Sequence, residues 1–217
     1  MIKELFKYLK EHSGGALLLC FLACAYLIPL YFKYTSNIDL EELVSRPILS
    51  DSFKWYQPIV SIFVHANLSH YISNLAFIIT YSLFIGLLSN RWGLIFLVCM
   101  LGSYLADISF CLYNTSEDYR TIGSSGYAYG LIGIYFILFI KRAIKECYTS
   151  MKMFMPFAIS LILIVNSIIE TITLYGVEEN RIGHYIHTTS FIFSVFIYVI
   201  YIYLEKKFCF SKNNNYN

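Results

Sequence analysis

The chain has 217 residues, of which 58% are hydrophobic and only 14% charged, whereas soluble domains carry about 25% charged residues. Its mean hydropathy of +0.59 also indicates a lipid environment. The formal net charge of +2 is too small to indicate a nucleic-acid-binding protein. The composition therefore predicts an integral membrane protein that contacts the lipid bilayer.

Six stretches are apolar and long enough to cross a bilayer, which takes about 20 helical residues. Unpaired backbone polar groups are too costly in lipid, so each stretch is predicted to be a helix. In chain order they cover about residues 16–32, 67–88, 92–113, 125–140, 154–174 and 184–204. We expect one all-α integral membrane domain over residues 1–217, with an N-terminal segment of about 1–15 and a polar tail of about 205–217.

Basic residues indicate the orientation, because Lys and Arg accumulate on the cytoplasmic side. Of the 16 Lys and Arg residues, eleven lie in the termini and in the second and fourth loops, and five lie in the other loops. This split predicts a multi-pass protein of the cell membrane with both termini in the cytoplasm. The outward ends of the helices then lie at the start of the second, fourth and sixth spans.

Polar residues at the start of the second span form the first candidate cluster, with His65, His70 and Asn74. His70 and Asn74 are four residues apart, so they share a helix face and both can donate hydrogen bonds from it. Polar groups in a membrane are costly and are candidates for function. The alternative is that they only join neighbouring helices.

The second cluster is Gly123-Ser124-Ser125-Gly126, where an outer loop turns into the fourth span. Ser125 is predicted at a helix N-terminus, where free N–H groups and the helix dipole favour a developing oxyanion. Glycines at 126, 130 and 133 then form a smooth face for helix packing. The alternative is an ordinary N-cap serine before packing glycines.

The third cluster, on the sixth span, places His187, Ser190 and Ser194 on one helix face. This face could pack against the glycine face and bring His187 beside Ser125. A serine with a base and nearby donors fits acyl transfer, which needs no cofactor or metal. Asp107 is the only nearby carboxylate, and we do not expect it to orient the base.

Together these motifs resemble the rhomboid family of intramembrane serine proteases over about residues 55–194. Residues 123–133, G-S-S-G-Y-A-Y-G-L-I-G, are similar to the family pattern G-x-S-G-x-x-x-G-x-x-G. His65-x4-His70-x3-Asn74 is similar to the family's H-x4-H-x3-N. A histidine on the sixth helix completes the resemblance, which implies a rhomboid-like bundle of six transmembrane helices.

The resemblance implies that Ser125 is the nucleophile and His187 its base, acting as a dyad near the outer surface. It assigns the oxyanion donors to His70 and Asn74, with the backbone N–H of Ser125. The implied supporting residues are Tyr129 against the histidine ring, His65 in a water-accessible cavity, and Gly123 and Gly126. The implied partners are transmembrane segments of other proteins, with no nucleic acid.

Some positions depart from the family pattern. Ile186 stands where Ala is usual, Ser190 where Gly is usual, and Tyr56 where the Trp-Arg pair of the first outer loop has Arg. These changes leave open a catalytically weak member. A second alternative is a catalytically inactive relative that binds membrane helices. A transporter or channel subunit is a third alternative, because polar clusters also line ion paths.

Overall fold

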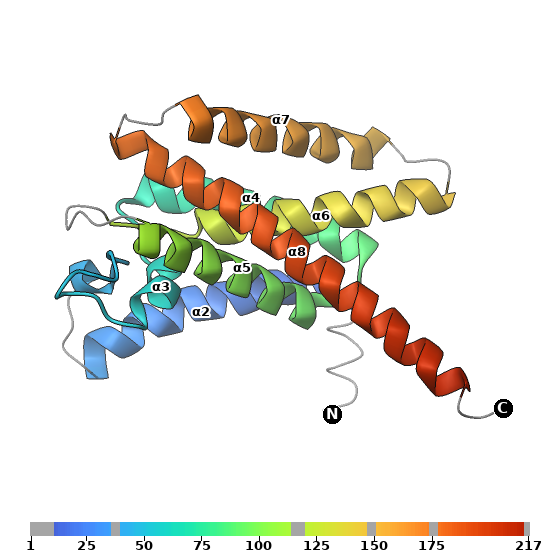
Figure 1. The fold of residues 1–217 in the computed structure, drawn as a ribbon, viewed down its shortest axis with the longest axis horizontal. Coiled ribbons are helices and arrows are strands. Elements are labelled where there is room, and N and C mark those ends of the chain that lie inside the picture. The colour runs from blue at the N-terminus through green and yellow to red at the C-terminus, as the bar shows by residue number, and fades with distance from the viewer. Residues whose placement is uncertain (1–10, 36–39, 114–119, 147–150, 174–177, 215–217) are drawn as a thin grey trace.

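The computed structural model describes residues 11–35, 40–113, 120–146, 151–173 and 178–214, and it is a bundle of helices (Figure 1). The expected all-α fold is thus confirmed for these residues. In chain order the helices are α2 (Ser13–Thr35), α3 (Gln57–Val60), α4 (Leu68–Leu88), α5 (Trp92–Tyr113), α6 (Ser125–Glu146), α7 (Met151–Thr173) and α8 (Glu178–Asn214). Two short 3-10 helices, η1 (Leu40–Leu43) and η2 (Ser61–Phe63), lie between α2 and α4.

Five of these helices, α4 to α8, are long and apolar enough to cross a membrane. The apolar part of α2, Ser13–Pro29, is shorter, so the sixth crossing expected from the sequence stays a prediction. The predicted span 92–113 coincides with α5, whereas α6 and α8 continue past residues 140 and 204. Helix α8 reaches Asn214 and so includes most of the stretch expected as a polar tail.

Helix α6 lies at the centre of the bundle, between α8, α5 and α4. Its buried face is made of large side chains without solvent exposure, among them Tyr127, Leu131 and Tyr135. The face of α6 that packs against α8 is different, because it carries glycines in place of large side chains. Burial of these apolar groups positions the first turn of α6, which begins at Ser125.

Small residues set how closely α5, α6 and α8 approach one another. Ser194 of α8 lies between Gly102 of α5 and Gly130 of α6. A Cβ atom added at Gly102 would clash with the Ser194 hydroxyl, and one added at Gly130 would lie 2.7 Å from it. The glycine face predicted from the sequence therefore does pack against the small polar face of α8.

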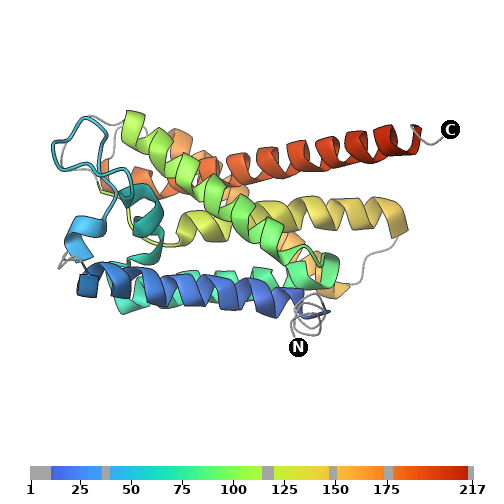
Figure 2. The same cartoon turned by 90° about the horizontal axis from the view of Figure 1, so that it is seen from below.

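Helices α2 and α4 lie side by side (Figure 2), and glycines allow this contact as well. A Cβ atom at Gly86 would lie 2.5 Å from the backbone nitrogen of Gly14. Beside them, the Ser13 hydroxyl donates to the Ser89 carbonyl over 2.8 Å, which joins the start of α2 to the end of α4.

Helix α7 lies along one edge of the bundle (Figure 1), packing mainly against α8 and less against α6. The buried Tyr81 hydroxyl joins it to α4, with a hydrogen bond of 2.8 Å to the Ser160 hydroxyl and one of 3.4 Å to the Pro156 carbonyl. An apolar groove of about 360 Å³ runs between α4 and α7, lined by residues that include Phe77, Phe84 and Ile159.

Candidate active site

The turn that leads into α6 is fixed by its neighbours. Thr121 forms a β-bridge with Ser45, and the Gly123 N–H donates to the Ser61 carbonyl over 2.9 Å. Gly123 has a φ of +105°, a conformation that favours glycine because it has no Cβ atom. The chain then reverses into the helix, and Ser125 is the first residue of α6.

Two donors from α4 lie against this turn. A Cβ atom at Gly123 would lie 2.7 Å from Cε1 of His70 and 3.4 Å from Nδ2 of Asn74, so only glycine leaves room for both side chains. The Asn74 amide nitrogen is buried and has no hydrogen-bond partner in the described part of the protein. A buried donor without a partner is costly. This amide N–H group can therefore gain a hydrogen bond when an oxyanion develops nearby.

The ring of His187 stacks on Tyr129, with ring centroids 4.2 Å apart and planes 4° from parallel. Tyr129 is four residues after Ser125 on α6, so the two share a helix face. The stacking therefore places His187 beside the face of α6 that begins with Ser125. Among the described residues, the buried His187 Nδ1 atom has no hydrogen-bond partner, so no described carboxylate orients the ring.

The next contact down the helix pair explains how α8 approaches so closely. A Cβ atom at Gly126 would lie 2.6 Å from the Ser103 hydroxyl, 2.8 Å from the Ser190 hydroxyl and 3.3 Å from Cγ2 of Ile186. Ile186 and Ser190, the two positions that depart from the family pattern, thus both pack on Gly126. Gly126 accommodates the larger side chains at these two positions.

Within the described residues, no hydrogen bond joins the Ser125 hydroxyl to His187. Catalytic hydrogen bonds are often long or poorly aligned until a substrate binds. Beside Ser125 lies a cavity of about 210 Å³, which is large enough to hold water. Its polar lining includes Ser61, Ser103 and Asp107.

Asp107 of α5 holds the turn rather than the histidine. Its two carboxylate oxygens accept from the Thr121 hydroxyl over 2.5 Å and from the Ser61 hydroxyl over 3.0 Å. Thr121 and Ser61 are the same residues that fix the backbone before Ser125. The sequence alone singled out Asp107 but gave no indication of these partners, which are distant along the chain.

His65 also holds this turn. Its Nε2 atom lies 3.2 Å from the Ser124 backbone nitrogen, which donates to it, and 3.0 Å from the Ser124 hydroxyl. Burial, and then repulsion by His70, lower the pKa of His65 to about 4, although a hydrogen bond with the Phe63 backbone opposes the shift. His65 is therefore neutral at pH 7 and can accept the Ser124 N–H. It is not among the residues that line the 210 Å³ cavity.

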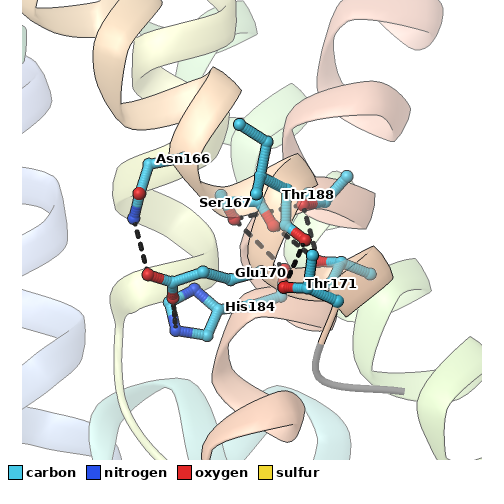
Figure 3. A network of polar contacts seen from close by, with 8 residues as sticks. Asn166, Ser167, Glu170, Thr171, His184 and Thr188 are labelled. Atoms are coloured by element: carbon cyan, nitrogen blue, oxygen red, sulfur yellow. Dashed lines mark hydrogen bonds and ion pairs between the residues drawn. The ribbon is translucent and has the colours of Figure 1, made fainter.

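A polar network joins α7 to α8 (Figure 3), and it includes residues that flank His187 in the sequence. Glu170 forms an ion pair with His184 and accepts a 3.0 Å hydrogen bond from Asn166. Ser167 bonds to Thr188, the residue after His187, over 3.1 Å. This network was not predicted from the sequence.

Comparison with known proteins gives one match. A family model described as a Rhomboid domain matches residues 52–204. No curated protein and no solved structure matches the chain. The matched range contains every candidate site residue described above, together with helices α4 to α7 and most of α8.

Proposed function

Because the chain belongs to the rhomboid family, we propose that it is an intramembrane serine endopeptidase that cuts transmembrane segments of other membrane proteins. Ser125 is the nucleophile and His187 its base. The observation that carries this proposal is the stacking of His187 on Tyr129, one turn along the face of α6 that starts with Ser125.

The proposed reaction follows from these positions. The Ser125 hydroxyl attacks the peptide carbonyl while His187 removes its proton, and the same histidine returns a proton to the leaving amine. The oxyanion accepts hydrogen bonds from Asn74 Nδ2, His70 and the Ser125 N–H. The free N–H groups at the start of α6 add the favourable end of the helix dipole. Water from the cavity beside Ser125 then hydrolyses the acyl enzyme.

The proposed orientation places Ser125 toward the outer side of the cell membrane and both termini in the cytoplasm. The support is the split of eleven Lys and Arg residues against five. Cysteines introduced at Leu49 and at Lys145 test it, since these exposed residues lie at opposite ends of the bundle. A membrane-impermeant maleimide on intact cells should label position 49 and not position 145.

A fluorophosphonate probe, which reacts with activated serines, tests the activity itself. We expect the purified protein and a Ser124→Ala variant to be labelled, and Ser125→Ala to remain unlabelled. Mass spectrometry should then find a cut within a model transmembrane substrate. Absence of both labelling and cleavage would favour the alternative, an inactive relative that binds membrane helices.

A further inference from the structure

A basic hollow lies at the end of the bundle opposite to Ser125. It has a volume of about 650 Å³, within the range of small-ligand sites. It is enclosed by the end of α4, the link to α5, the last turns of α6 and the distal part of α8, which lie at the right of Figure 2. Its charged lining residues are Glu11, Arg91, Lys141, Arg142, Lys145, Glu205 and Lys206.

The charges of this hollow do not cancel. Arg91 and Glu205 neutralise each other in an ion pair of 2.7 Å, and this pairing raises the pKa of Arg91. Apart from Arg142, the remaining charged lining consists of three lysines, Lys141, Lys145 and Lys206, and one acidic residue, Glu11. Among the described residues, no ion pair involves these lysines. Basic charge therefore exceeds acidic charge in the described lining of the hollow.

The lysines of α6 are the cations that the proposal uses. Arg142, on the same helix, donates to the Leu87 carbonyl at the end of α4 over 3.4 Å. Lys141 and Lys145 are four residues apart on α6, so they point to the same side. Basic residues are common at helix C-termini and on the cytoplasmic side of membrane proteins. Neither tendency requires the basic residues of α6, α8 and the link before α5 to converge around one cavity.

The rim of the hollow is apolar. Leu87 and Leu88 of α4 and Ile202 of α8 also line it, and Leu87 is 66% exposed. A ligand with a negative head and hydrocarbon chains satisfies both parts at once. Its head would meet the lysines while its chains lay along the apolar surfaces of α4 and α8.

We propose that the basic hollow binds a phosphate-bearing anion, and that its source is the headgroup of an anionic phospholipid. Lys and Arg are the side chains that bind phosphate oxygens, and basic pockets between transmembrane helices suit such headgroups. The proposal does not depend on proteolysis, because the hollow and Ser125 lie at opposite ends of α6.

The test is binding of phosphatidylglycerol to the full chain in detergent, measured by native mass spectrometry against phosphatidylcholine. We expect the double variant Lys141→Gln/Lys145→Gln to weaken phosphatidylglycerol binding by about tenfold. The matched control Lys54→Gln/Lys207→Gln removes the same charge from exposed lysines outside the hollow and should bind as the parent does. Equal loss in both double variants, or loss in neither, would overturn the proposal.

A variant that is expected to bind the lipid more tightly distinguishes loss of the site from misfolding. Glu205→Gln removes a negative charge and releases Arg91, so it should bind phosphatidylglycerol more tightly. Unchanged or weaker binding by this variant would contradict a phosphate site. Competition identifies the source: if glycerol 3-phosphate displaces the lipid at equal concentration, the ligand is a soluble phosphate, and if it does not, the lipid is the ligand. Fluorophosphonate labelling of Ser125 in the same samples reports the protease separately.

Discussion

Helices α6 and α7 are neighbours in the chain but differ in how the bundle holds them. Of the apolar stretch of α6, 56% is buried, compared with 22% for α7. Helix α6 is fixed on three sides and starts with Ser125, whereas α7 is held by α8 and by single hydrogen bonds such as Tyr81–Ser160. The proposed chemistry therefore sits on the most buried of the spanning helices, and its neighbour α7 is among the least buried.

The largest expected effect concerns α6 and the proposed catalytic dyad. Ser125→Ala and His187→Ala should each lower cleavage of a transmembrane substrate by about 10⁴-fold or more, because the pair acts as a unit. The double variant should be no worse than either single one. Ser167→Ala on α7 should keep substantial activity in the same assay. Complete loss of activity in this variant would contradict the expected difference between α6 and α7.

A smaller loss is expected from the donors on α4. Asn74→Ala and His70→Ala should each slow cleavage by about 10²–10³-fold, as when one oxyanion donor is removed. Ser125 should still react with the fluorophosphonate probe at a measurable rate, because its base remains. Wild-type cleavage rates in both variants would mean that these residues serve packing alone.

The packing of α6 against α8 can be broken with one methyl group. Gly126→Ala places a Cβ atom 2.6 Å from the Ser103 hydroxyl and 2.8 Å from the Ser190 hydroxyl. Overpacking of this kind costs about 1–3 kcal/mol, so the thermal midpoint and the activity should both fall. Gly15→Ala is the control, since nothing lies within 4 Å of its added Cβ atom. Equal midpoints for the two variants would show that the contact has room to adjust.

The smallest expected effect concerns α7 and the hydrogen bond that joins it to α4. Tyr81→Phe removes the 2.8 Å hydrogen bond to Ser160, which contributes about 1 kcal/mol. If α7 must move for a substrate helix to enter, cleavage of a transmembrane substrate should rise by about fivefold. The rate of fluorophosphonate labelling should stay the same, because a small probe needs no lateral opening. A rise in both rates would place the effect at Ser125 instead.

The sequence predicted the helices well because lipid imposes strong rules on them. Span 92–113 was predicted to the residue, since polar residues flank an apolar run there. Helices α6 and α8 were predicted too short, because counting apolar residues stops at the first charge while the helical backbone continues beyond it. Periodicity also predicted the glycine face of α6 and its contact with α8.

The partners of individual polar groups were not predictable in the same way. Asp107 binds Ser61, which is 46 positions away, and His65 binds Ser124, which is 59 positions away. No helical period relates such residues, and each side chain has several possible partners in the sequence. The ion pair of Glu170 and His184 likewise depends on how α7 and α8 align, which the sequence leaves undetermined.

The position of Ser194 between Gly102 and Gly130 has an evolutionary consequence. Its hydroxyl fills the space that a side chain at either glycine would need, so neither glycine can be replaced while the serine remains. At Gly102 the loss of this hydroxyl is not enough, because an added Cβ atom would still lie 3.0 Å from the backbone nitrogen of Ser194. At Gly130 the hydroxyl makes the tightest contact, and the next atom, Cβ of Cys99, is 3.3 Å away. A smaller side chain at position 194 therefore makes Ala easier to accept at position 130 than at position 102, so the two glycines differ in how freely they can change during evolution.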